Sequence, residues 1–251
     1  MGQRLGQHFL INGSILDRIA AAVCPVHTPL VIEIGPGRGA LTEKLLQRAD
    51  RVVAIELDPD LVADLRARFD SRLEVIHSDV LATDLSKWGP APIAGNLPYY
   101  ITSPILEKVG RVEFPHAVFL MQREVAQRLS AEPGTRDYGY LTVQTALFAY
   151  ARTLFGVKPG AFRPPPKVDS AVVLLEPRAP VVSDTEAFLK FASACFRQKR
   201  KTLRNNLAGV YGKEAVDALP EAGKRAEQLS LDELAAIFNR LKGDPIASPQ
   251  A

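Results

Sequence analysis

The first two-thirds of the chain alternates short apolar runs with longer segments in which apolar residues recur every three to four positions. Short apolar runs bounded by turn residues are typical of buried strands, whereas the longer periodicity predicts amphipathic helices. Regular alternation of the two predicts a mostly parallel sheet with helices on both faces. The expected strands are 30–34, 52–56, 73–77, 91–95 and 117–121, and the expected helices are 14–23, 40–48, 59–69, 103–109 and 123–130.

The pattern changes after this alternation. Residues 141–151 predict one more helix, and two β-rich runs follow at 153–157 and 171–176. Residues 162–167 between them contain three prolines, which fix φ and predict a stiff turn. We therefore expect an antiparallel hairpin at the edge of the sheet.

A boundary is predicted at Pro177–Pro180, because only helical periodicity follows it. Ser183 and Ser230 each precede an acidic residue by three positions, the spacing of a capping box. We expect an α/β domain over residues 1–178, a small all-α domain over 181–243 and a disordered tail over 244–251.

Composition narrows the class of protein without identifying it. The chain has 251 residues, a net charge of +3 and two cysteines, Cys24 and Cys195, without metal-ligand or disulfide spacing. No signal segment or run of about 18 apolar residues is present. We expect a monomeric cytoplasmic protein with neither a metal site nor a membrane span.

A glycine loop follows the first strand of the sheet. Gly35, Gly37 and Gly39 let the backbone approach a ligand, and the next helix offers its N-terminal amides. Glu56, 21 residues after Gly35, can bind both hydroxyls of a ribose. The same spacing fits the dinucleotide fingerprint of dehydrogenases, so the loop predicts a nucleotide cofactor without fixing its identity.

Further residues favour S-adenosylmethionine. Glu33 can hold the amino-acid end of this cofactor through loop amides or water, although a solvated charge at a strand end is the alternative. Asp79, after the third strand, can contact an adenine amine.

Asn96-Leu97-Pro98-Tyr99 follows the fourth strand and has no role in hydride transfer. The Asn96 side-chain oxygen and the Leu97 carbonyl can accept hydrogen bonds from an exocyclic adenine amine. Tyr99 can stack on that base, and Phe162 is the candidate for its opposite face. Tyr100 is expected to pack rather than to act in chemistry, and in isolation the whole segment could be an ordinary turn.

A basic run in the second domain predicts contacts with RNA phosphates. If the run is helical, Arg197, Lys201 and Arg204 share a face, although a solvated helix face would look the same. Five positive charges fall within eight residues, at Arg197, Lys199, Arg200, Lys201 and Arg204. The turn-rich loop 132–139 predicts a mobile lid, an RNA-contacting loop or a plain surface connection.

Together these segments resemble the small-subunit ribosomal RNA adenine dimethyltransferases of the KsgA type. The resemblance implies a class I, Rossmann-like methyltransferase fold and S-adenosylmethionine as cofactor. It also places the segment at His8 and Leu10 in the cofactor pocket with Gly35, Glu56, Asp79 and Asn96, although many members carry asparagine where this chain has His8. The resemblance rests on segments 6–10, 33–39, 56–58, 79–80, 96–99, 162–170 and 200–207.

The resemblance further implies dimethylation of two adjacent adenosines in a loop near the 3′ end of 16S rRNA, during assembly of the small subunit. A sister group methylates large-subunit rRNA and confers antibiotic resistance, and it is the second reading. A ribosome-assembly factor in which binding outweighs catalysis is the third. A dehydrogenase and a DNA adenine methyltransferase fit the segment 96–99 less well.

Overall fold

The computed structural model describes residues 8–242, which form two compact units. The first unit contains the described residues up to Gln127 together with Ala149–Pro177. The second contains Arg128–Phe148 and the residues from Arg178 onward. The expected tail at 244–251 lies outside the described residues, as do Gly6 and Gln7 of segment 6–10.

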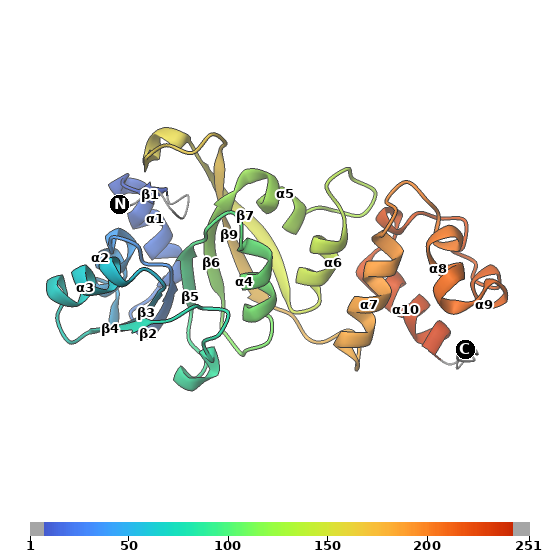
Figure 1. Cartoon of the computed structure of the whole chain (residues 1–251), viewed down its shortest axis with the longest axis horizontal. Helices are drawn as coiled ribbons and strands as arrows, with labels where there is room; N and C mark the ends of the chain where they lie inside the picture. The colour runs from blue at the N-terminus through green and yellow to red at the C-terminus, as the bar shows by residue number, and fades with distance from the viewer. Residues whose placement is uncertain (1–7, 243–251) are drawn as a thin grey trace. The chain divides into compact units, whose positions relative to one another are not determined.

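A seven-stranded sheet forms the centre of the first unit, in the order β4-β3-β2-β5-β6-β9-β7. The first five strands are parallel, whereas β9 pairs antiparallel with β6 and with β7 at the edge. The predicted parallel sheet with an antiparallel edge hairpin is therefore confirmed (Figure 1). The strands are β2 (Thr28–Ile34), β3 (Ala49–Glu56), β4 (Leu73–His77), β5 (Ile93–Asn96), β6 (Ala117–Gln122), β7 (Ala149–Val157) and β9 (Ser170–Pro177).

Helices follow the parallel strands in the order that the periodicity predicts. Asn12 and Asp58 cap the first and third of them by accepting hydrogen bonds from the amides of Ile15 (3.1 Å) and Asp60 (2.9 Å). The helices are α1 (Gly13–Val23), α2 (Ala40–Leu46), α3 (Pro59–Arg68), α4 (Thr102–Val109) and α5 (Arg123–Leu129), with short 3₁₀ turns η1 (Leu85–Trp88) and η2 (Pro159–Ala161).

Helices α1, α2 and α3 share one hydrophobic core with the sheet. Val31 and Val52 of the strands are fully buried against Ile19 of α1, Leu45 of α2 and Leu65 of α3. The alternate strand residues, including Ile32, Ile34, Val53 and Ile55, are also buried. Burial of successive residues on both faces is the usual environment of parallel strands and leaves only the strand ends for chemistry.

A second, two-stranded sheet joins segments that are distant in sequence. The strand β1 (Phe9–Leu10) pairs antiparallel with β8 (Phe162–Arg163), and the Ile11 amide donates to the Ala161 carbonyl (2.9 Å). The expected stiff turn at 162–167 thus begins with a strand. This pairing ties the start of the described chain to the proline-rich segment.

The second unit contains five helices within its described residues, packed around Phe188, Phe191 and Phe238. Ser230 and Glu233 form the predicted capping box, with bonds of 3.2 and 2.8 Å. At the other predicted box the cap is Asp184, not Ser183, because the Asp184 carboxylate accepts from the Ala187 amide. The helices are α6 (Tyr140–Ala146), α7 (Thr185–Phe196), α8 (Leu203–Tyr211), α9 (Lys213–Asp217) and α10 (Leu231–Lys242), with the 3₁₀ turn η3 (Ala226–Gln228).

Two expectations around residue 146 were wrong in detail. The helix expected at 141–151 ends at Ala146, and residues 149–151 begin β7 instead. Pairing of this segment with β9, for example Tyr150 opposite Glu176, outweighs the local helical pattern. Residues 128–148, expected in the α/β domain, pack with the helical unit because Val143 and Leu147 join its core.

Candidate active site

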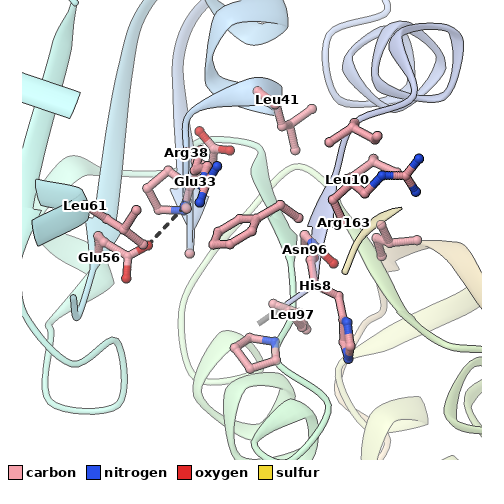
Figure 2. A pocket seen from close by; sticks show the side chains of 18 of the residues that line it. His8, Leu10, Glu33, Arg38, Leu41, Glu56, Leu61, Asn96, Leu97 and Arg163 are labelled. Carbon is pink, nitrogen blue, oxygen red and sulfur yellow. Dashed lines mark hydrogen bonds between the residues drawn. The ribbon is translucent and has the colours of Figure 1, made fainter. Parts of the chain in front are cut away.

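A cavity of about 500 Å³ opens in the first unit at the carboxyl ends of β2, β3 and β5. This edge is where open parallel sheets bind ligands, because the strand ends and the following loops expose backbone groups there. Figure 2 shows Glu33 and Glu56 on one side of the cavity, and Asn96 with His8 on the other. Most of the predicted site residues line it: His8, Leu10, Glu33, Gly35, Gly37, Glu56, Asn96, Leu97, Pro98 and Tyr99.

Asn96 ends β5 and has a fixed side-chain orientation. Its Nδ2 donates to the backbone carbonyl of His8 at 3.0 Å. Since a carbonyl can only accept, this bond fixes the amide nitrogen toward β1 and leaves Oδ1 as the free acceptor. Among residues 8–242 no donor reaches that oxygen, so it is available to a ligand amine.

The backbone after Asn96 is held in one conformation. The Leu97 amide donates to the Leu120 carbonyl (2.9 Å), while the Pro98 carbonyl accepts from the Ile101 amide (3.2 Å) and the Thr102 hydroxyl (3.2 Å). Within the described chain the Leu97 carbonyl has no donor, as expected for an acceptor that serves a ligand. Among residues 8–242, Asn96 Oδ1 and the Leu97 carbonyl are thus two acceptors without a donor, on residues that line the cavity.

Tyr99 lies at the cavity and is anchored by its hydroxyl. Tyr99 Oη and Ser170 Oγ share a hydrogen bond of 2.7 Å, and the ring lies 5.9 Å from that of His8. Burial raises the pKa of Tyr99 above its ordinary value, and the bond to Ser170 opposes that rise only in part. The phenol is therefore neutral at physiological pH and suits stacking rather than proton transfer.

Two aromatic predictions were wrong. Phe162 is fully buried in the hydrophobic core and does not line the cavity, so in this structure it offers no face to a base. Its side chain points into the core because its β8 neighbour Arg163 takes the exposed position of the two-residue strand. Tyr100, expected to pack, is instead 62% exposed.

Glu56 holds the glycine loop from the end of β3. One carboxylate oxygen accepts from the Gly37 amide (3.0 Å), and the other accepts from the amides of Leu57 (2.9 Å) and Asp58 (3.0 Å). Gly37 has a φ of +57°, a backbone conformation that residues with a side chain rarely adopt. A Cβ at this position would lie 3.1 Å from the Phe9 ring. A buried carboxylate beside a tight loop fits the predicted ribose-binding role.

Glu33 lies on β2 below the same loop and is 1% exposed. Burial, opposed by a 2.6 Å hydrogen bond from Thr42 Oγ1 and assisted by the charge of Glu56, raises the pKa of Glu33 to about 7. The alternative of a solvated strand-end charge is thereby excluded. A buried carboxylate that lacks a cationic partner in the described chain fits the ammonium group of S-adenosylmethionine.

Two predicted cofactor residues do not line the cavity. Gly39 is the N-cap of α2 with a φ of +76°, and a Cβ there would lie 2.8 Å from the side chains of Leu65 and Phe69. Asp79 accepts from the Leu81 amide (2.8 Å) at the exposed turn after β4. The position of Asp79 after β4 predicted a place in the cofactor site, but its carboxylate accepts a hydrogen bond within the following turn.

Several lining residues escaped the sequence reasoning. Phe9 lies beside Gly37, and the Arg38 guanidinium lies 4.8 Å from the centre of its ring. Arg163 and Pro164 also line the cavity, and the Pro164 carbonyl accepts from His8 Nδ1 (2.8 Å). Since a carbonyl can only accept, Nδ1 is the donor in this bond. The β1–β8 pairing brings these residues here, and no local sequence pattern signals such pairing.

The basic run of the second unit is not helical as expected. Arg197 is the C-cap of α7, Arg204 lies in the first turn of α8, and the residues between the two helices form a turn. Asn206 Nδ2 holds this turn by donating to the carbonyls of Cys195 and Gln198. All five basic residues are exposed, but Lys199 contacts the Arg136 carbonyl and Glu227, and Arg204 pairs with Asp217 (2.6 Å). Within the described chain the side chains of Arg197, Arg200 and Lys201 have no such partner.

The loop 132–139 is tied to the same unit. The Gly134 amide donates to the Glu227 carbonyl (2.6 Å), and Lys199 contacts the Arg136 carbonyl. These bonds do not favour a mobile lid, and they place the loop beside the basic turn.

Residues 8–242 contain no group of three or more histidine, cysteine or acidic side chains placed to hold a metal ion. None of the helices in this part of the chain has the length and hydropathy of a membrane-spanning segment.

Comparison with known proteins assigns the family. The family described as ribosomal RNA adenine dimethylase matches residues 2–243. The "probable ribosomal RNA small subunit methyltransferase A" of Methanosarcina mazei is 44% identical, over 96% of this chain and 93% of the relative. The "ribosomal RNA small subunit methyltransferase A" of Acidobacterium capsulatum is also 44% identical, over 95% and 90%.

Solved structures agree with these relatives. A dimethyladenosine transferase from Plasmodium falciparum superimposes with a TM-score of 0.80 at 28% identity, over 94% of this chain and 98% of that one. The 23S rRNA methyltransferase ErmE gives 0.72 at 29% identity, over 93% and 99%. The predicted class I methyltransferase fold and the predicted use of S-adenosylmethionine are confirmed. The chain therefore belongs to the ribosomal RNA adenine dimethylase family.

Proposed function

We propose that this protein dimethylates the exocyclic amines of two adjacent adenosines in a loop near the 3′ end of 16S rRNA, within immature small ribosomal subunits in the cytoplasm. The observation that carries the chemistry is the fixed Asn96 amide, whose Oδ1 is left free by the bond from Nδ2 to the His8 carbonyl. The choice of small-subunit RNA is supported by the names of the most similar relatives.

Asn96 and Leu97 act on the target amine. Its lone pair is delocalised into the adenine ring, so the free amine is a poor nucleophile. Hydrogen bonds from the amine to Asn96 Oδ1 and to the Leu97 carbonyl favour a pyramidal nitrogen and aim its lone pair. Because the acceptors are held in place before the substrate arrives, catalysis rests on positioning and electrostatics rather than on a strong base.

The remaining lining residues hold the two reactants. S-adenosylmethionine supplies an activated methyl group as a sulfonium. Glu33 fits its ammonium group, and Glu56 fits the ribose hydroxyls. Tyr99 stacks on the extruded adenine.

The turn at residues 197–202 of the second unit, the basic turn, binds RNA phosphates. Arg197, Arg200 and Lys201 are exposed and lack acidic partners within the described chain, so binding costs them no ion pair. Charge reversal at Arg200 and Lys201 should weaken RNA binding and flatten its salt dependence. Charge reversal at Arg204, already paired with Asp217, is the matched control and should have a smaller effect.

The deciding experiment offers the protein labelled S-adenosylmethionine with immature small subunits, large-subunit RNA or DNA, followed by nucleoside analysis. We expect dimethyladenosine from the small subunits alone. Transfer to large-subunit RNA would instead favour the activity named for ErmE, which superimposes well on this chain. Tight binding of small subunits without transfer would favour an assembly factor. Sedimentation of the purified protein tests the expected monomer.

A further inference from the structure

A second group of basic residues lies in the first unit, apart from the basic run 197–204. The Asp169 Oδ2 accepts from Lys158 Nζ (2.8 Å) and from Arg123 Nη1 (3.0 Å). The Arg123 amide also donates to the Asp169 carbonyl (3.0 Å). Arg123 follows β6, Lys158 follows β7, and Asp169 precedes β9, so three segments meet at one point.

This point adjoins the catalytic motif. Asp169 is followed directly by Ser170, whose hydroxyl shares the 2.7 Å hydrogen bond with Tyr99. The strand ends involved are the carboxyl end of parallel β6 and the amino end of antiparallel β9, which lie at the same edge of the sheet. The two cations are therefore beside the residue that stacks on the substrate.

Positive side chains outnumber the acidic partner at this point of the fold. The side chains of Lys158 and Arg123 are 82% and 56% exposed, whereas that of Asp169 is 22% exposed. The single carboxylate of Asp169 pairs with two positive side chains, Lys158 and Arg123. Exposed Arg163 and Lys167, on the connecting segment between Lys158 and Asp169, add two further positive charges. Exposed ion pairs of this kind contribute little to stability, so a structural purpose does not explain the excess.

We propose that Arg123 and Lys158, oriented by Asp169, bind phosphates of the RNA strand that flanks the target adenosine. The inference rests on the proposed function and extends it, because it gives the catalytic unit its own RNA contacts. An extruded base keeps its neighbouring phosphates close to the cavity mouth, and an exposed cation pair beside Tyr99 can hold them. Asp169 fixes the direction of both side chains and so lowers the entropy cost of binding.

The test compares two double variants. Arg123→Gln with Lys158→Gln removes the proposed contacts. Arg111→Gln with Arg72→Gln is the matched control, since both are exposed arginines in ion pairs that precede parallel strands β6 and β4, at the opposite edge of the sheet. The probe is a hairpin RNA whose loop contains two adjacent adenosines. Binding is measured across a salt series, and KM and kcat are measured on immature subunits.

We expect the first variant to bind the hairpin several-fold more weakly, with its log–log salt slope reduced by about 1.4, or about 0.7 for each lost phosphate contact. Cofactor affinity and kcat should be retained while KM rises, and Lys158→Arg should keep wild-type binding. An RNA affinity and slope equal to wild type, or an equal loss in the control, would overturn the inference. Wild-type transfer to subunits tests the proposed function separately, because it does not depend on the variants.

Discussion

The Asn96 side chain donates to the backbone carbonyl of His8 across 88 positions of sequence, at 3.0 Å. This bond joins the residue before β1 to the end of β5 and decides which end of the amide faces the cavity. A residue chosen for its chemistry is thus oriented by backbone from another part of the chain, and His8 contributes through its carbonyl whatever its side chain.

Asn96→Ala should lower kcat by at least about 100-fold, the usual loss when one preorganised hydrogen-bonding group is removed from the reacting centre. Cofactor affinity, measured by calorimetry, should change little because Glu33 and Glu56 remain. Asn96→Asp keeps an acceptor but loses the donor to the His8 carbonyl, and it should also be impaired. Full activity in the alanine variant would exclude the proposed mechanism.

Tyr99 has two separable roles. Tyr99→Ala removes the ring and should raise the KM for RNA by about 5- to 150-fold, equivalent to the roughly 1–3 kcal/mol of a stacked base. Tyr99→Phe keeps the ring and loses only the bond to Ser170, so its effect should be much smaller. Equal losses in the two variants would mean that the hydroxyl anchor, not stacking, is what matters.

Glu33 predicts a pH dependence of stability. Its pKa is about 7 in the folded protein, against an ordinary value of 4.5, so the folded state binds the proton more tightly. Stability should therefore fall as pH rises from about 4.5 to about 7, by up to roughly 1.4 kcal/mol per pH unit. Glu33→Gln cannot titrate, and its denaturant midpoint should exceed that of wild type at pH 8 but match it near pH 4. Parallel pH profiles would contradict this assignment.

The ionisation of Glu33 should also make cofactor affinity depend on pH, with affinity rising over the range in which stability falls. An ammonium ligand favours the ionised carboxylate, so affinity for S-adenosylmethionine should increase as pH rises through about 7. Calorimetry in buffers of different ionisation enthalpy should detect a proton released on binding near pH 6. Glu33→Gln should bind weakly and without that proton release.

Gly37→Ala should weaken cofactor binding beyond its effect on stability. The left-handed φ of +57° costs a residue with a side chain about 1–2 kcal/mol, and the new Cβ would press on the Phe9 ring. Gly134→Ala is the control, because it has a φ of +85° but open space around its Cβ position. Both variants should melt lower, but only Gly37→Ala should lose cofactor affinity.

Asn206 should control the shape of the basic turn. Its Nδ2 donates to the carbonyls of Cys195 (2.8 Å) and Gln198 (3.2 Å), and its buried Oδ1 has no partner among residues 8–242. Asn206→Ala leaves both carbonyls without this donor and should cost about 1–3 kcal/mol of stability. RNA affinity should fall with it, while Asn205→Ala, at an exposed position, should change neither. Unchanged RNA binding by a destabilised Asn206→Ala would show that the turn needs no fixed shape.

The local pattern of the chain determined the parallel sheet, the helices between its strands and the cavity edge. Hydrophobic periodicity and turn residues are local signals, and parallel strands that end in Glu33-Ile34, Glu56 and Asn96 must place these side chains at one edge. The spacing along the chain therefore predicted that these candidate side chains would line one cavity, and they do.

Tertiary pairing decided the rest. Contacts with residues distant in sequence bury Phe162 and leave Tyr100 exposed. Such contacts also make residues 149–151 part of strand β7, because they pair with β9. The same holds for the cations at Asp169, whose three segments have no common local pattern. A side chain's type is a local property, but its direction and its neighbours are set by long-range contacts, and these choose among conformations of nearly equal local energy.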